Sequence, residues 1–473
     1  MTTFPQTLKE LEQHVHGTLS VEHGEVIVRK PDALRGPWTD QLVRTAVFGK
    51  DEAARDRARW LLRAAAWESG VRSSSIHNLY AARGRGDIAA TFTVPALNLR
   101  GPTYDQARAA FRAAVRLKVG AFIFELARSE VGYTDQRPGE YAAAVTAAAM
   151  REGFRGPLFL QGDHYQFSPS KYPKDPLAEV KGIQGLIEES LAAGYRNVDI
   201  DASTLVTLEP KDLRAQQRVN GQLTAQMTDF IRAREEPGMA VSVGGEIGEV
   251  GKSNSKPEEL DAFVAEFKAH HARAPGLSKI SVNTGSSHGG VVLPDGSIAK
   301  VAIDFQALKA LGEAARRHGA GGAVQHGAST LPEEAFHHFP EVGALEVHLA
   351  TGFQNLVFDH PALPPELKQR MNAWTKEHCA DERKPADTEE QFIYKSRKKA
   401  TGPFKRDLWE LPEDARRRIF GDLEARFALL FEKLRVTDTR GVADMWALQE
   451  ARQPRPSGAA SVLDTGMAKH EGE

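Results

Sequence analysis

Residues 140–164 read EYAAAVTAAAMREGFRGPLFLQGDH, and they contain the unit from which the fold can be predicted. The Ala-rich segment Glu140–Glu152 is typical of a helix, and the short run Pro157–Gln161 is typical of a buried strand. Asp163 and His164 follow this strand after a single glycine. Because barrel enzymes place their catalytic groups at the carboxyl ends of the strands, this unit predicts both a fold and the position of a site.

The same alternation of strand and helix recurs on both sides of this unit. Helix-like stretches such as Tyr104–Leu117 and Asp304–His318 separate the strands. The eight candidate strands are Thr91–Leu97, Ala121–Leu126, Pro157–Gln161, Asn197–Asp201, Met239–Gly244, Lys279–Asn283, Gly322–Gln325 and Ala344–Ala350. Eight parallel βα units predict an α/β fold of the TIM (β/α)8 barrel type. The alternative is an open doubly wound sheet, whose nucleotide-binding form needs a Gly-rich turn after the first strand, and residues 98–102 (NLRGP) are no such turn.

The barrel does not account for the whole chain, so we expect additions at both ends. Residues 1–88 are predicted to form a helical N-terminal extension, and residues 89–359 the catalytic barrel. Residues 360–455 are predicted to form a helical C-terminal extension. Residues 456–473, which contain Pro, Gly, Ser and Ala, are expected to be a disordered tail.

The bulk composition excludes several functional classes. The chain has 473 residues and a formal net charge of −2, which gives no indication of a nucleic-acid or membrane-surface partner. Cys379 is the single cysteine, so no intramolecular disulfide can form. The N-terminus does not have the pattern of a signal peptide, and no apolar run approaches the ~20 residues of a membrane span. The expectation is a soluble cytoplasmic protein.

Histidines and carboxylates gather at the predicted strand ends. These residues are Asp163, His164, Asp201, Glu246, His288 and His326. In a closed barrel they would converge on one mouth, where imidazoles and carboxylates together suit a zinc-type cation. Three protein ligands with one open position are typical of a catalytic metal site. Gly289, Gly327 and Ser329 lie in the loops after two late strands, where small residues allow backbone N–H groups to approach a phosphate.

These motifs together resemble the class II, metal-dependent fructose-bisphosphate and tagatose-bisphosphate aldolases. The resemblance runs in register from about Thr91 to Asp359. The matching elements are Asp163-His164, Ile200-Asp201-Ala202-Ser203, Glu246-Ile247-Gly248, Ser287-His288-Gly289, His326 to Pro332, and His348-Leu349-Ala350-Thr351.

The resemblance implies a role for each matching residue. His164, His288 and His326 would bind the catalytic Zn²⁺ or another divalent metal, and Asp201 and Glu246 match carboxylates that bind metal in an alternative or second position. Asp163 matches the acid/base that acts on the aldehyde oxygen. The residues expected to contact the ketose phosphate half of the substrate are Gly289, Gly327, Ser329, His348 and Thr351. The implied reaction is cleavage or formation of a C–C bond in a phosphorylated ketose, and related aldolases suggest a homo-oligomer by analogy.

Three departures from the family pattern keep other functions open. The family has Asn at the position of His348 and Glu at the position of Gly244. Its mobile-loop glutamate falls on Ser253 or Asn254 here, and Glu249 is close but out of register. A metal-dependent sugar or sugar-phosphate epimerase on the same barrel, and a non-catalytic aldolase subunit, are therefore the alternatives.

One basic segment lies in the C-terminal extension, at Ser396–Arg406. It could reach over the barrel mouth and bind a second phosphate, since Arg and Lys suit that anion. A solvated basic face is the simpler interpretation and is the one we expect.

Overall fold

The computed structural model describes residues 3–248, 253–285, 293 and 303–456. Eight parallel strands close into a barrel in the order β4-β5-β6-β7-β8-β9-β10-β11, with β11 paired to β4. Their bounds are β4 Val94–Asn98, β5 Ile123–Ala127, β6 Gly156–Gln166, β7 Asn197–Asp201, β8 Ser242–Glu246, β9 Lys279–Val282, β10 Ala323–Gln325 and β11 Glu346–Leu349. The predicted (β/α)8 fold is confirmed, and each expected strand overlaps one observed strand.

Helices surround the barrel, as the βα units require. They are α5 Thr103–Arg116, α6 Arg128–Tyr133, α7 Pro138–Arg151, α8 Pro176–Ala192, α9 Leu213–Arg232, α10 Pro257–His270, α11 Phe305–Arg317, α12 His338–Glu341 and α13 Thr351–Phe358. α5 is typical of the ring: the alanines and Phe111 of this helix are buried toward the barrel, while Arg112 and Arg116 pair with Glu424 on the outside.

The N-terminal segment is mostly helical but also contains strands that the sequence did not indicate. Its elements are α1 Leu8–Val15, β1 Leu19–Glu22, β2 Glu25–Val28, α2 Pro37–Phe48, α3 Glu52–Glu68, β3 Val71–Ser75 and α4 His77–Arg85. β1 and β2 pair as an antiparallel hairpin. β3 pairs in parallel with the start of β6 and therefore extends the barrel sheet outward.

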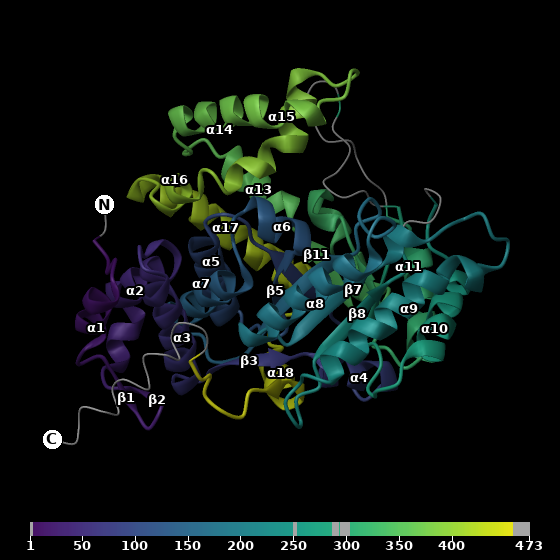
Figure 1. Ribbon diagram of the computed structural model, residues 1–473, viewed down its shortest axis with the longest axis horizontal. Coiled ribbons are helices and arrows are strands. Elements are labelled where there is room, and N and C mark those ends of the chain that lie inside the picture. Colours follow the sequence, from purple (N-terminus) through teal and green to yellow (C-terminus); the bar gives the residue numbers. More distant parts are fainter. Residues whose placement is uncertain (1–2, 249–252, 286–292, 294–302, 457–473) are drawn as a thin grey trace.

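The C-terminal segment covers the barrel in two places. Its elements are α14 Pro365–His378, α15 Glu389–Ser396, α16 Lys405–Trp409, α17 Glu413–Lys433, α18 Arg440–Trp446 and β12 Leu448–Gln449. α17 packs against α5 on the outside of the barrel, and α14 and α15 form a cap at the top of Figure 1. One hydrophobic core includes Leu42 of the N-terminal segment, Phe124 of the barrel and Phe427 of α17. Among the described residues, none of the helices is both long and apolar enough to cross a bilayer.

Candidate active site

A β-bulge in β6 places two neighbouring polar side chains on the same side of the strand. Gly162 pairs with Val198 and Tyr165 with Ile200, so β6 has one residue more than β7 across this interval. His164 takes up the extra length with a φ of 40°, in the left-handed region that non-glycine residues rarely adopt. Such a conformation costs about 1–3 kcal/mol and is concentrated at functional sites. The bulge explains why Asp163 and His164 both point into the barrel mouth.

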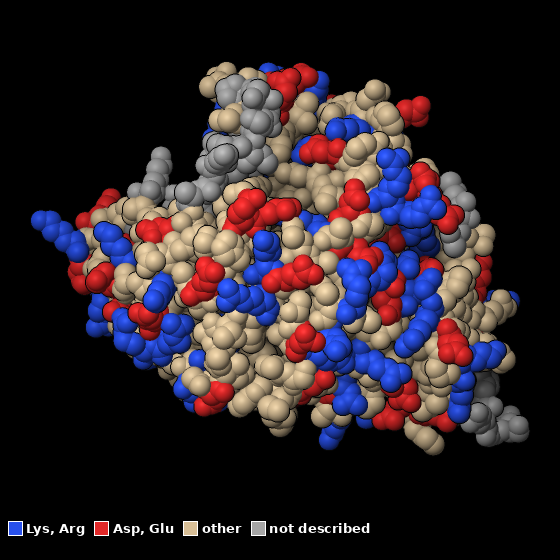
Figure 2. All heavy atoms as spheres, turned by 180° about the vertical axis from the view of Figure 1, so that it is seen from behind, with Lys and Arg blue, Asp and Glu red and all other residues tan. Residues whose placement is uncertain are grey.

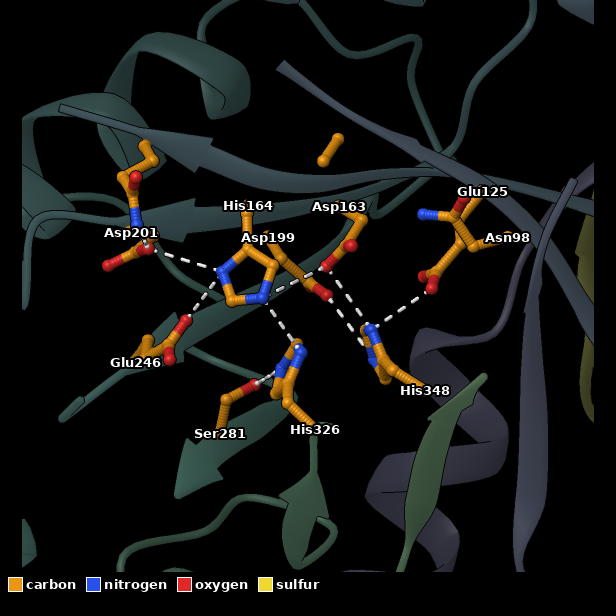
Figure 3. A network of polar contacts seen from close by, with 12 residues as sticks. Asn98, Glu125, Asp163, His164, Asp199, Asp201, Glu246, Ser281, His326 and His348 are labelled. Carbon is orange, nitrogen blue, oxygen red and sulfur yellow. Dashed lines mark hydrogen bonds and ion pairs between the residues drawn. The ribbon is translucent and has the colours of Figure 1, made fainter. Parts of the chain in front are cut away.

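His164 lies at the centre of a cluster formed by three further strands (Figure 3). Its Nδ1 atom is 3.2 Å from Asp201 Oδ2 at the end of β7 and 2.9 Å from Glu246 Oε2 at the end of β8. Its Nε2 atom is 2.8 Å from Nδ1 of His326, directly after β10. Asp163 Oδ1 lies 3.7 Å from the same Nε2 atom. The structure therefore brings together five of the six residues predicted to bind metal or move protons.

The geometry of this cluster fits a divalent cation. His164, Glu246 and His326 each offer one ligand atom, and the three atoms lie within 4.8 Å of one another. Two imidazole nitrogens and a carboxylate oxygen are donors that zinc accepts. Ser281 Oγ lies 3.0 Å from Nε2 of His326, which orients this ring as a hydrogen-bond partner of a metal-binding histidine does. His288 and Gly289 lie outside the described residues.

The charged groups of the cluster perturb one another. Burial alone would lower the pKa of His164, but the Asp163 and Glu246 carboxylates more than offset this and raise the pKa well above its usual value. Burial raises the pKa of Glu246, and the neighbouring Asp201 carboxylate adds to that rise. For Asp201 the opposing effect of burial is outweighed by hydrogen bonds from His164 and Ser203, which lower its pKa. An imidazole held between ionised carboxylates is a place where positive charge is stabilised.

His348 connects Asp163 to the barrel interior. Its Nδ1 atom is 3.2 Å from Asp163 Oδ1 and 3.2 Å from Glu125 Oε1 on β5. The Nε2 atom is 2.6 Å from Oε1 of Glu346, two residues earlier on β11. His348 is 5% exposed and Glu125 is fully buried. Burial and the Asp163 carboxylate raise the pKa of Glu125 to about 7.

A lysine below this histidine balances part of the buried negative charge. Nζ of Lys279 is 2.5 Å from Glu346 Oε1, 2.9 Å from Asp199 Oδ2 and 2.7 Å from Gln161 Oε1. This arrangement explains the glycine at position 244. A Cβ atom there would lie 2.3 Å from Asp199 Oδ1 and 2.9 Å from Cε of Lys279, so any larger residue would collide with the ion pair.

A cavity of about 870 Å³ opens above the cluster. On one side it is lined by Gly327, Ser329, His348 and Thr351, four of the five residues predicted to bind substrate. Gly327 has a φ of 69°, and the short helix after it contains Ser329. Thr351 is the first residue of α13, so the N-terminus of this helix, where an anion is favoured, lies at the cavity.

Cationic side chains also line the cavity, and only one of them, Lys398, belongs to the basic segment Ser396–Arg406 that the sequence indicated. Arg100, Arg128, Lys171, Lys395 and Lys398 line the cavity. Arg100 pairs with Glu130 at 2.5 Å, and Arg128 pairs with Glu179 at 2.5 Å. Lys398 has no carboxylate within 4.0 Å in the described part of the chain, and burial together with Arg100 lowers its pKa.

The expectation of a solvated basic face at Ser396–Arg406 is wrong for Arg397 and Lys405, whereas the side chains of Lys399 and Arg406 are 40% and 57% exposed. Arg397 is 8% exposed and pairs with Asp359 at 2.7 Å, and Lys405 is 7% exposed and pairs with Glu140 at 3.1 Å. Of the three residues Arg397, Lys398 and Lys405, Lys398 alone lines the cavity. Because the chain folds back over the barrel mouth here, residues that are far from the barrel in sequence reach the site.

Only some of the residues at the position expected for the loop glutamate belong to the described part of the chain. Glu249 lies outside the described residues, and Ser253 and Asn254 are described. Asn254 donates from Nδ2 to Oδ2 of Asp304 at 3.4 Å, and neither residue lines the cavity. The signal for the residues that were missed, Glu125 and Lys279, was a charged residue within an otherwise apolar strand.

Comparison with known proteins gives one family. A family model described as "Fructose-bisphosphate aldolase class-II" matches residues 88–404. No curated protein matches the chain. The similar solved structures include a probable tagatose 6 phosphate kinase from Sinorhizobium meliloti 1021, with 16% identity over 74% of this chain and 99% of that chain and a TM-score of 0.49.

Two further solved structures are similar. The fructose-bisphosphate aldolase from Campylobacter jejuni has 17% identity over 78% of this chain and 97% of that chain, with a TM-score of 0.46. The fructuronate-tagaturonate epimerase UxaE from Cohnella laeviribosi has 12% identity over 92% of this chain and 90% of that chain, with a TM-score of 0.48. Since all three TM-scores are below 0.5, the assignment to a family depends on the family match.

Proposed function

The chain belongs to the class II fructose-bisphosphate aldolase family, and from this premise we propose that it is a metal-dependent lyase that cleaves or forms a C–C bond in a phosphorylated ketose. The observation that carries the proposal is the convergence of His164, Glu246 and His326 on one point beside Asp163. Family membership shows an aldolase-type enzyme; the metal, the substrate and the residue roles are proposed.

The metal site is proposed to consist of His164, His288 and His326, with Glu246 and Asp201 as alternative or second ligands. The donors described above fit Zn²⁺ or another divalent cation. A cation bound there would act as a Lewis acid on the substrate carbonyl and stabilise the negative charge that remains on the ketose fragment after cleavage. The Asp201 carboxylate, 3.2 Å from Nδ1 of His164, would keep this imidazole oriented.

Asp163 is proposed to move the proton of the substrate hydroxyl. In cleavage its carboxylate accepts the proton from the hydroxyl on the aldehyde side of the bond. The C–C bonding pair then stays on the carbon beside the carbonyl, and a C=O bond forms on the released aldehyde. In the reverse direction Asp163 returns the proton as the bond forms. Because Asp163 is 5% exposed, bulk water has little access to this proton.

The cavity walls support an anionic substrate with two charged ends. The N-terminus of α13 and the loop with Gly327 and Ser329 suit one phosphate. Lys398, next to Arg100, would be relieved of like-charge repulsion by a second anionic group bound beside it. We therefore propose a ketose bisphosphate as the substrate class. The cytoplasmic location and the homo-oligomeric state are retained as predictions.

The proposal is tested by assaying purified protein for both cleavage and isomerisation. Fructose 1,6-bisphosphate and tagatose 1,6-bisphosphate are supplied in turn, and triose phosphate and ketose isomers are measured, before and after chelation with EDTA and after addition of Zn²⁺ or Co²⁺. An aldolase releases triose phosphate, loses activity on chelation and regains it with metal. An isomeric ketose without triose phosphate would indicate the epimerase instead, and a protein that binds no divalent metal would support a non-catalytic subunit.

A further inference from the structure

The interior of this barrel contains charged side chains where apolar ones are usual. Glu125, Lys279 and Glu346 are each fully buried, and Asp199 is 5% exposed. Barrel interiors are normally filled by branched apolar residues, and burying an ionised group is costly unless it is paired and hydrogen-bonded. The cost of this cluster points to a task for it beyond stability.

Glu346 is fixed on both of its oxygens. Oε1 lies 2.5 Å from Nζ of Lys279 and accepts a hydrogen bond from Gln161 at 3.1 Å. Oε2 accepts a hydrogen bond from the hydroxyl of Tyr80. Lys279 is itself held by Asp199 at 2.9 Å. The carboxylate of Glu346 is therefore locked in one orientation by partners from three other elements, β9, β6 and α4.

Glu346 in turn determines how His348 is oriented. The two residues are two positions apart on β11, so their side chains leave the same face of the strand. Nε2 of His348 lies 2.6 Å from Oε1 of Glu346 and donates to it, which directs Nδ1 toward the barrel mouth. There Nδ1 lies 3.2 Å from Oδ1 of Asp163 and equally 3.2 Å from Oε1 of Glu125 (Figure 3). The ring of His348 also lies against that of His326, with 4.0 Å between their centroids, which limits its rotation.

We propose that Glu346, anchored by Lys279, is a positioning residue that acts through His348 to hold the catalytic carboxylate of Asp163. His348 contacts Asp163 through Oδ1 and so would hold this carboxylate in a fixed position. This inference rests on the proposed function, because it assigns a support to the proton-transfer group of that reaction. It gives His348 a role different from the substrate contact expected from the sequence.

A metal ion is the competing occupant of this region. Asp199, Glu346 and His348 offer ligand atoms within 4.8 Å of one another. However, the ammonium of Lys279 already lies 2.9 and 2.5 Å from the first two carboxylates, and a divalent cation there would face a buried positive charge. The negative charge of Asp199 and Glu346 is therefore balanced by Lys279, and these residues, with His348, hold the catalytic carboxylate in place.

The test separates the two halves of the aldolase reaction. Glu346→Gln removes the charge with little change of shape, and His348→Asn removes the imidazole. Cleavage of the bisphosphate that wild type prefers is compared with exchange of the carbon-bound proton of dihydroxyacetone phosphate in D2O. Only cleavage requires Asp163 to move the hydroxyl proton.

In both variants we expect kcat for cleavage to fall about 10- to 100-fold, as is usual when the partner that orients an active-site group is lost. The KM should stay within about twofold and proton exchange should fall much less than cleavage, because metal binding is untouched. Zinc content should equal that of wild type. The control is Glu450→Gln, which alters a carboxylate that is 5% exposed and lies 2.6 Å from Arg196, away from the site.

The outcomes are distinct. A selective loss of cleavage, with the control unaffected, supports the positioning role. Equal losses in both reactions, or unchanged cleavage, would overturn it. A wild-type enzyme inactive in both assays would instead refute the proposed function. A crystal structure of Glu346→Gln gives a readout independent of activity: His348 should rotate, so that its Nδ1 atom no longer lies within hydrogen-bonding distance of Asp163 Oδ1.

Discussion

Replacing Lys279 by methionine should destabilise the protein strongly although the side chain never reaches the surface. The ammonium lies between Glu346 and Asp199, both buried, at 2.5 and 2.9 Å. Burial would raise the pKa of Glu346, but Lys279 and His348 lower it to about 2. Relative to the ordinary value of 4.5, the net shift corresponds to about 3 kcal/mol, to which burial, Lys279 and His348 all contribute. Removing one partner of a buried ion pair typically costs about 3–5 kcal/mol, which agrees with that figure.

The expected loss of unfolding free energy can be converted into a decrease in the melting temperature, Tm. At about 2 cal/mol/K of unfolding entropy per residue, a chain of 473 residues has about 1 kcal/mol/K, so Lys279→Met should lower Tm by roughly 3–5 °C at pH 8. Differential scanning fluorimetry measures this shift. Lys376→Met serves as the control, because the ion pair of Lys376 with Glu389 is about half exposed and such pairs contribute at most ~1 kcal/mol.

The pH dependence of the difference in Tm between wild type and Lys279→Met provides a second check, because the direction of the change with pH can be predicted. In wild type the depressed pKa of Glu346 gives stability that is present above about pH 4.5 and lost as the pH falls toward 2. In the variant, Glu346 and Asp199 lack their cation, so the pKa of Glu346 should rise, and the pKa of Asp199, which burial already raises to about 6 in wild type, should rise further. The native state of the variant should therefore gain protons more readily. The difference in Tm should therefore narrow from pH 8 to pH 5.5. A variant whose Tm stays within 1 °C of wild type at pH 8 would refute this account of the buried charges.

Three further predictions concern other parts of the chain. Burial and nearby guanidinium groups lower the pKa of His77 to about 4, so stability should fall by up to about 3 kcal/mol as the pH drops from 6.5 toward 4, and His77→Gln should flatten that slope in denaturant titrations. Lys398→Ala should raise KM for a bisphosphate about tenfold with kcat nearly unchanged, whereas Lys399→Ala, at a residue that pairs with Glu382 and does not line the cavity, should leave both constants near wild type. Gly244→Ala should cost about 1–3 kcal/mol in thermal unfolding, since its Cβ would lie 2.3 Å from Asp199 Oδ1; a neutral result would show that the ion pair can shift.

The order of the barrel strands could be predicted from the sequence because each strand is a short apolar run between helical stretches. Asn197–Asp201 agrees at both ends with β7, whereas Pro157–Gln161 is five residues shorter than β6 at its end. The difference has a physical cause: beyond Gln161 the strand continues through the bulge as polar residues, and hydrophobic periodicity carries no information there. The hairpin β1–β2 was missed because a two-stranded ribbon on the surface needs few apolar residues.

From the sequence, only those site residues could be predicted that lie near the ends of strands or in motifs of the family. His164, Glu246 and His326 lie at or just after the ends of their strands and were found. Lys398 lies in the basic segment Ser396–Arg406, for which a solvated face was expected, because no local pattern encodes the return of the C-terminal segment to the cavity. Lys279 was missed for another reason: a single lysine in an apolar strand gives no sign of the two carboxylates that it will contact.

The barrel holds two polar clusters, the candidate metal ligands and the buried charged residues. The strands that carry each cluster explain how both fit in one narrow barrel. In an eight-stranded barrel, each layer of inward side chains comes from alternate strands. The candidate metal ligands His164, Glu246 and His326 belong to β6, β8 and the position directly after β10, and the alternative ligand Asp201 is the last residue of β7. The buried charged residues come from the other set, Glu125 on β5, Asp199 on β7, Lys279 on β9 and Glu346 on β11. The buried charged residues and the candidate metal ligands occupy different positions in the barrel. The charged residues can therefore pack beneath the metal cluster without competing with it for space. Asp163 joins the two sets because the bulge turns it toward His348 while its neighbour His164 faces the metal cluster. A one-residue deletion that removed the bulge would therefore separate the proton-transfer group from its support while leaving both sets of strands in place.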